Sequence, residues 1–220
     1  CSLSWDDLRA AGLGLNLFAG GFHAVLTGFN TATSYSNPAS LRLLRAPCGQ
    51  TRHAALFAPA APGCYLLDEL RGLGYRTWAA SDHDGTYDHY AEVLQGHAHA
   101  DLPMGLAGVP VAKLNFNGTA IYDDEAVLAK WWAQRQRSGV PRAALYFNAV
   151  SLHQGAHRPG QAGDWFADRV KHFREAATEL FAALGRFEAL VAASGRRVVV
   201  LVVAEHGAAL EGTSVQAPDL

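Results

Sequence analysis

The apolar run VVVLVVA at residues 198–204 constrains the fold of this chain more than any other sequence feature. A membrane-spanning helix needs about 20 apolar residues, so this run is too short to cross a bilayer and is typical of a strand buried on both faces. The preceding segment, 164–194, repeats apolar residues every three or four positions, which predicts a long amphipathic helix. A buried strand beside such a helix indicates a sheet that is covered by helices.

The rest of the chain alternates between the same two patterns. The sequence predicts helices at 5–11, 38–46, 64–73, 86–95, 124–137 and 164–194, and strands at 22–29, 75–80, 110–115, 143–150 and 197–204. This order is typical of an α/β fold with a mostly parallel central sheet and helices on both faces. Because 220 residues, half of them hydrophobic, can bury one such sheet, we expect a single domain over residues 1–220.

The charge balance argues against polyanionic partners. The chain has 18 Lys and Arg residues against 20 Asp and Glu residues, a formal net charge of -2, which gives no basic surface for nucleic acid. We therefore expect no nucleic-acid partner. The sequence opens abruptly at CSLSWDD and stops at SVQAPDL, with no export signal in view. We expect it to be a piece of a longer protein.

Three cysteines, Cys1, Cys48 and Cys64, allow at most one disulfide within the chain. Cys48 and Cys64 bracket a segment with little periodicity, which a disulfide would tie down. Such a bond would stabilise the fold by roughly 3 kcal/mol in the chain-entropy model, and it would indicate an oxidising compartment. Two free buried thiols are equally compatible with the spacing alone.

Glu205 and His206 directly follow the strand expected at 197–204, and ligands of α/β sheets bind beyond the carboxyl ends of the strands. Gly207 allows the backbone to turn there, so that both side chains can reach one ion. With the thiolate of Cys1, a carboxylate and an imidazole make a plausible zinc set that leaves a fourth position for a nucleophile or a substrate oxygen. The alternative is a solvated loop acid beside a surface histidine.

Ser36 stands where a polar run changes into the helical segment 38–46. As an N-cap it would accept a backbone hydrogen bond, with Pro38 in the first turn. The same place suits a nucleophile, because the N–H groups and dipole at a helix N-terminus stabilise a phosphoryl group on the serine oxygen. A bound metal would lower the pKa of the hydroxyl. The two interpretations are compatible.

His153 and His157 follow the strand expected at 143–150, four residues apart. Gly155, Pro159 and Gly160 argue against a helix here, so the pair does not form the helical zinc-protease motif. Either these are loop histidines without a role, or one lies beside a phosphate and donates a hydrogen bond or a proton to it.

Five segments occur in an order that points to a known family: CSLSWDDL, TATSYSNPASLRLLRAPCGQT, PGCYLLDELRGLGY, SLHQGAHRPG and AEHGAALEG. Over nearly its whole length, the chain resembles the BcsG family of cellulose phosphoethanolamine transferases in the alkaline phosphatase superfamily. The resemblance implies an alkaline-phosphatase-like catalytic domain, incomplete at both ends, from a longer membrane-anchored protein. It also implies a location at the periplasmic face of the bacterial inner membrane.

The resemblance assigns roles to individual residues. Ser36 matches the nucleophile, which accepts phosphoethanolamine from phosphatidylethanolamine and passes it to glucose 6-hydroxyls of cellulose through a covalent intermediate. Cys1, Ser36, Glu205 and His206 match the ligands of a zinc ion. His153 matches an active-site histidine that binds phosphate or transfers a proton.

The resemblance also implies that Cys48 and Cys64 form a structural disulfide. His157 is a candidate for substrate binding because of its place in the loop after the strand expected at 143–150. The expected partners are the donor lipid, the cellulose acceptor and a cellulose synthase complex, with membrane contact through segments outside this chain. The alternatives are a phosphohydrolase, a transferase of the lipid A or teichoic acid type, and an inactive scaffold domain of the cellulose synthesis complex.

Overall fold

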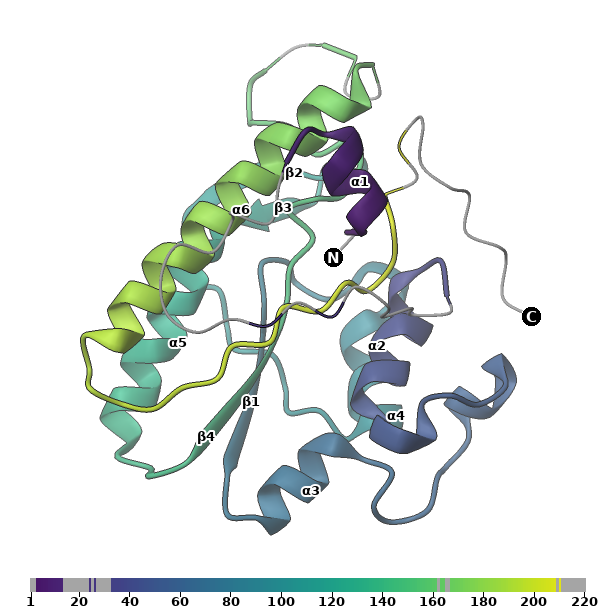
Figure 1. Cartoon of the computed structure of the whole chain (residues 1–220), viewed down its shortest axis with the longest axis vertical. Coiled ribbons are helices and arrows are strands. Elements are labelled where there is room, and N and C mark those ends of the chain that lie inside the picture. Colours follow the sequence, from purple (N-terminus) through teal and green to yellow (C-terminus); the bar gives the residue numbers. More distant parts are fainter. Residues whose placement is uncertain are drawn as a thin grey trace.

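Two parallel strands with helices on both faces form the framework of the protein (Figure 1). A computed structural model describes residues 3–13, 24, 26, 33–161, 163–164, 167–208 and 210. The elements are α1 (Trp5–Ala10), α2 (Ser36–Leu44), α3 (Leu66–Gly72), β1 (Arg76–Ser81), α4 (Tyr90–Ala98), β2 (Val111–Leu114), β3 (Ala120–Tyr122), α5 (Asp124–Ser138), β4 (Ala143–Asn148) and α6 (Arg169–Ala192). Short 3₁₀ helices lie at Ala46–Cys48, His53–Phe57 and Tyr87–His89.

Strands β1 and β4 pair in parallel, from Arg76 opposite Ala143 to Ser81 opposite Asn148. Because successive side chains of a strand point to opposite faces, the pair buries side chains on both sides. One face packs against α5 and α6, and the other against α2 and α4 (Figure 1). The first cluster includes Trp78, Leu145, Trp131 and Phe187, and the second includes Tyr146, Leu41 and Leu94. This mixed α/β arrangement confirms the predicted fold class.

Local capping signals set the ends of the helices. Asp123 caps α5 by accepting a hydrogen bond from the N–H of Ala126 at 2.8 Å. Gly139 ends the same helix with a φ of 65°, a left-handed conformation that costs glycine little. Ser4 caps α1 by accepting the N–H of Asp7 at 3.1 Å. These ends agree with the predicted helices at 124–137 and 5–11 to within one residue.

The predicted strand at 197–204 is wrong. Residues 198–203 form no ladder with the described part of the chain, and Leu201 is 81% exposed. The β-branched valines of this run favour extended backbone, but a strand exists only when a neighbouring strand supplies its hydrogen bonds. The predicted strand at 22–29 lies almost wholly outside the described residues. The predicted strand at 110–115 appears as β2, which pairs antiparallel with β3 in a separate hairpin and does not join the parallel pair.

The longest helix, α6, begins at Arg169, five residues later than predicted. Asp168 caps it by accepting the N–H of Lys171 at 3.2 Å, which fixes its start. Among the described residues, every helix is too short or too polar to cross a bilayer.

Cys48 and Cys64 form a disulfide with a Cα–Cα distance of 5.4 Å, which confirms the pairing implied by the resemblance. The bond links the 3₁₀ turn after α2 to the residues before α3. It therefore fixes the segment that follows the C-terminal end of α2.

Removing this disulfide should destabilise the protein by roughly 3 kcal/mol, because the unfolded chain gains the freedom of a loop with 16 residues of sequence separation. The test is urea unfolding of the double variant Cys48→Ser and Cys64→Ser, with and without dithiothreitol. The wild type in dithiothreitol should match the double variant, whose own midpoint should not respond to the reductant. Equal stability of the oxidised wild type and the double variant would contradict the prediction.

Candidate active site

Ser36 is the first residue of α2, and its side chain is half-buried. The N-cap is Tyr35, which makes no side-chain capping bond, so the interpretation of Ser36 as the N-cap is wrong by one residue. The cause lies in the backbone, because Tyr35 already has the extended φ of -149° that an N-cap takes. Ser36 therefore lies inside the first turn, where unbonded N–H groups and the helix dipole favour an anion.

Ser40 lies one turn after Ser36 and is fully buried. Its hydroxyl donates a hydrogen bond to Oε1 of Glu205 at 2.7 Å. Residues four apart on a helix share a face, with Cβ atoms about 5–6 Å apart. Ser36 therefore lies on the face of α2 that meets Glu205, about one turn from the contact. The contact that the fold makes between these two parts of the chain is the one from Ser40 to Glu205, 165 positions apart in the sequence.

Two tyrosine hydroxyls complete the cluster around Ser40. Tyr90 of α4 lies 2.8 Å from the Ser40 hydroxyl, Tyr146 of β4 lies 3.0 Å from it, and the two tyrosine oxygens are 3.0 Å apart. Burial raises the pKa of Tyr146 to about 12, and it raises the pKa of Tyr90 well above its ordinary value. Both tyrosines therefore keep their protons at neutral pH.

Hydrogen bonds from two distant parts of the chain also hold the segment 205–208. The N–H of Leu3 donates to the carbonyl of His206 at 2.6 Å, and the N–H of Ala208 donates to Oδ2 of Asp7 at 2.8 Å. Gln154 donates its amide N–H to the carbonyl of Ala208. Asp7 is completely buried, so its carboxylate fixes this segment from inside the protein.

His206 and His153 are oriented in the same way by the backbone. Nδ1 of His206 lies 3.0 Å from the carbonyl of Gly207, and Nδ1 of His153 lies 3.1 Å from the carbonyl of Gln154. Because a carbonyl only accepts, each Nδ1 carries the proton and Nε2 holds the lone pair in the neutral ring. Burial lowers the pKa of His153, and the nearby His206 lowers it further, so His153 is neutral at pH 7.

His157 belongs to the edge of the β2–β3 hairpin. Its backbone exchanges two hydrogen bonds with Leu114, of 2.7 and 2.9 Å, and its Nδ1 lies 3.0 Å from the carbonyl of Gly155. Cys1 lies outside the described residues. Within the part of the chain that the structure describes, no three His, Cys, Asp or Glu side chains form a metal site by themselves.

A buried pair of carboxylates lies under the loop that carries His153, and the sequence analysis missed it. The Ser151 hydroxyl lies 2.8 Å from Oδ2 of Asp82 and within hydrogen-bonding distance of Oδ2 of Asp124. Asp82 also accepts the N–H of Val150 with both oxygens, at 2.9 and 3.0 Å. The signal in the sequence was the acid directly after β1, in SDHDG.

One of these two carboxyl groups holds a proton. A serine hydroxyl has one proton to donate, so a hydrogen bond to each carboxylate requires that one carboxyl group donates back to Ser151. Burial and the negative charge of Asp82 raise the pKa of Asp124 well above its ordinary value, whereas His83 and the N–H of Val150 partly offset the effect of burial at Asp82. We therefore assign the proton to Asp124.

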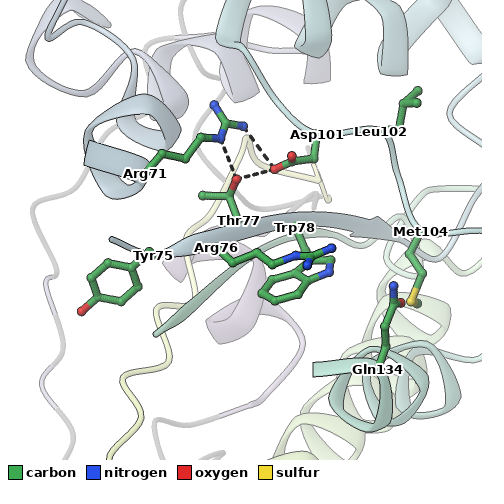
Figure 2. A pocket seen from close by; sticks show the side chains of 9 residues that line it. All are labelled: Arg71, Tyr75, Arg76, Thr77, Trp78, Asp101, Leu102, Met104 and Gln134. Atoms are coloured by element: carbon green, nitrogen blue, oxygen red, sulfur yellow. Dashed lines mark hydrogen bonds and ion pairs between the residues drawn. The ribbon is translucent and has the colours of Figure 1, made fainter. Parts of the chain in front are cut away.

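A hollow of about 590 Å³ lies at the amino-terminal end of β1, the end opposite to Asp82. Figure 2 shows Arg71 donating to Thr77 and Asp101, and Arg76 stacked over the ring of Trp78. Thr77 also donates to Asp101, at 2.5 Å. None of the residues predicted for the active site lines this hollow.

Asp124→Asn should remove a pH dependence of stability. Because the folded protein holds the carboxyl proton more tightly than the unfolded chain, this stabilisation is complete below pH 3.8 and is lost as pH rises through the raised pKa. Between pH 5 and pH 8, the free energy of unfolding of the variant should therefore rise relative to that of the wild type, because asparagine has no carboxyl proton to lose.

Urea unfolding of both proteins over this pH range measures the difference. Asp123→Asn is the matched control, because asparagine caps a helix as well as aspartate does, and this variant should keep the pH profile of the wild type. Parallel profiles for Asp124→Asn and the wild type would show that Asp124 is ionised throughout.

Comparison with known proteins agrees with the resemblance in the sequence. The family model described as the cellulose biosynthesis protein BcsG C-terminal domain matches residues 1–220. The cellulose biosynthesis protein BcsG of Escherichia coli K12 is 38% identical over 222 residues, which cover 100% of this chain and 38% of that protein. The protein of the same name from Salmonella typhimurium LT2 is 40% identical over 217 residues, covering 98% of this chain. The chain spans 38% of the length of these relatives. It belongs to the BcsG family, in the region of that family's C-terminal domain.

Proposed function

We propose that this chain acts in cellulose biosynthesis as the catalytic part of a zinc-dependent transferase, which moves phosphoethanolamine from phosphatidylethanolamine to glucose 6-hydroxyls of cellulose. The observation that carries the proposal is the face of α2, where Ser36 lies one turn from the Ser40–Glu205 contact. The names of both relatives and of the family model point to the same pathway.

The donor groups at this place fit a zinc ion. Zinc takes carboxylate oxygen, imidazole nitrogen and thiolate sulfur in tetrahedral sites. Glu205 supplies a carboxylate that is 3% exposed, and His206 donates from Nδ1 to a backbone carbonyl, which is the arrangement that aims Nε2 at a metal. Ser36 and Cys1 would complete the set. When bound there, zinc would lower the pKa of the Ser36 hydroxyl and stabilise charge on the phosphoryl oxygens.

In the first half-reaction, the Ser36 oxygen attacks phosphorus, and the bond between phosphorus and the diacylglycerol oxygen breaks. The proton of the Ser36 hydroxyl leaves with the diacylglycerol as its new hydroxyl. Phosphoethanolamine is then bonded to the serine oxygen at the N-terminus of α2, where backbone N–H groups stabilise its negative charge.

In the second half-reaction, a glucose 6-hydroxyl attacks the same phosphorus and Ser36 leaves. The neutral ring of His153 has its lone pair on Nε2, so it accepts the proton of the attacking hydroxyl and returns it to the serine oxygen. With water as the attacking group the same steps give hydrolysis, so the acceptor decides between the two enzyme classes.

The disulfide supports a location in an oxidising compartment. The periplasmic face of the inner membrane fits both this bond and a lipid donor. Partners in a cellulose synthase complex fit the pathway named for the relatives.

Incubating the full-length protein with phosphatidylethanolamine and zinc should leave one phosphoethanolamine group on the wild type. Ser36→Ala should show no adduct in intact-protein mass spectrometry, because the attacking oxygen is missing. Ser34→Ala is the matched control, since Ser34 is an exposed serine two residues earlier, and it should form the adduct normally. An adduct on Ser36→Ala would overturn the assignment of the nucleophile.

A cello-oligosaccharide added to the labelled protein separates transfer from hydrolysis. We expect the sugar to gain the mass of phosphoethanolamine as the protein loses it. Release of free phosphoethanolamine with unchanged sugar would favour a phosphohydrolase. A purified full-length protein with neither zinc nor adduct would favour the scaffold interpretation.

His153→Ala should lower kcat by about 10²–10⁴-fold, the usual contribution of a general base. His157→Ala should instead raise KM with a much smaller loss of kcat, if His157 binds substrate as predicted. Steady-state kinetics with the lipid donor and a cello-oligosaccharide measure both effects. A wild-type kcat for His153→Ala would remove His153 from the reaction.

A further inference from the structure

The hydroxyls of Ser40, Tyr90 and Tyr146 and the carboxylate of Glu205 form one buried hydrogen-bonded cluster. These residues come from α2, α4, β4 and the segment after α6. Ser40 is 0% exposed, Glu205 3% and Tyr90 7%. Polar groups buried this deeply are costly unless each is hydrogen-bonded, so the arrangement of their protons is strongly constrained.

The number of available protons determines which group donates in each hydrogen bond of the cluster. The Glu205 carboxylate only accepts, so the single proton of Ser40 is used in the 2.7 Å bond to Oε1. The Ser40 oxygen can then only accept from the tyrosines, of which Tyr90 is at 2.8 Å and Tyr146 at 3.0 Å. Tyr146 therefore donates to Ser40, and Tyr90 donates either to Ser40 or to Tyr146, whose oxygen lies 3.0 Å away. In both cases the order of donation is tyrosine to serine to carboxylate.

These hydrogen bonds, which run from the tyrosines through Ser40, fix the position of the Glu205 carboxylate. Each hydroxyl that donates to Ser40 polarises the Ser40 O–H bond and strengthens the hydrogen bond to Oε1. The two tyrosines are themselves held by packing, since Tyr90 lies in the hydrophobic cluster of α2 and α4 and Tyr146 packs against that cluster. Rotation of the Glu205 side chain would break a buried bond and leave Ser40 without its acceptor.

We propose that Ser40, Tyr90 and Tyr146 are positioning residues that hold Glu205 in the orientation for binding zinc. This inference rests on the proposed function, because it gives Glu205 the role of a zinc ligand. It goes beyond that function because it states that three residues outside the set of zinc ligands contribute to the affinity for zinc. Residues that orient a metal ligand typically contribute 10–100-fold to metal affinity.

The test is the zinc dissociation constant of the full-length protein, measured by competition with a colorimetric chelator. Ser40→Ala should weaken zinc binding about 10–100-fold. Tyr146→Phe and Tyr90→Phe keep their rings and lose only the hydroxyls, so each should weaken binding in the same direction by a smaller factor. Adding excess zinc should restore the turnover of all three variants.

Tyr65→Phe is the matched control. Tyr65 is also a buried tyrosine, 6% exposed, and its hydroxyl accepts the N–H of Ala60 at 2.9 Å. Its removal should lower stability about as much as Tyr146→Phe does, in urea unfolding with a chelator present, and should leave zinc affinity unchanged. This comparison separates positioning of Glu205 from a general effect on the core.

Each outcome decides one question. Wild-type zinc affinity in Ser40→Ala and in both tyrosine variants would overturn this inference and leave the proposed function standing. If Ser40→Ala does not fold, wild-type affinity in both tyrosine variants would overturn it in the same way. Equal weakening of zinc binding in Tyr65→Phe would also overturn it. Absence of zinc from the wild type would overturn the proposed function, and this inference with it.

Discussion

The hydrogen bond from Ser40 to Glu205 is the contact on which the candidate active site depends. It joins α2, which carries Ser36 at its first residue, to the segment that carries Glu205 and His206. A helix is rigid over one turn, so fixing Ser40 against Glu205 also fixes the distance from Ser36 to the same carboxylate. Two elements that are far apart in sequence are thereby held against each other.

The rest of the fold supports the two sides of this contact. On one side, α2 and α4 pack against the parallel pair β1–β4, and Tyr146 of β4 donates a hydrogen bond to Ser40. On the other side, α1 holds the segment 205–208 through Asp7, and the hydrophobic cluster of α1 and α6 stabilises α1. The pair Asp82 and Asp124 adds a third support, because it orders the loop from Val150 to His153 through Ser151.

Apolar periodicity predicted the helices well, because it acts within a few residues, as do the caps Ser4 and Asp123 that the structure shows. Non-local pairing was not predictable from such signals. Segment 198–203 has strong β propensity, yet no strand of the described chain pairs with it. The segment 110–115 forms a strand as predicted, but its partner β3 places it in a hairpin outside the parallel sheet.

The residues of the candidate site also divide into those with a local signal in the sequence and those without one. Ser36, Glu205 and His206 were predicted from local signals, namely a serine at a helix start and a pair of ligand-type residues after an apolar run. Ser40 was visible only as a serine four residues after Ser36, and its meaning depends on a carboxylate 165 residues away. Asp82 and Asp124 look like ordinary loop and helix-start acids in sequence, and only their shared contact with Ser151 reveals a buried proton.

In the proposed function, α2 and the segment 205–208 together form a zinc site at Ser36. The most direct test is an anomalous difference map at the zinc edge, from crystals of the full-length protein grown with zinc. We expect one strong peak about 2.0–2.2 Å from the Glu205 carboxylate and the His206 imidazole, with the Ser36 hydroxyl in its coordination shell. A peak elsewhere, or none beside Glu205 in zinc-loaded crystals, would contradict it.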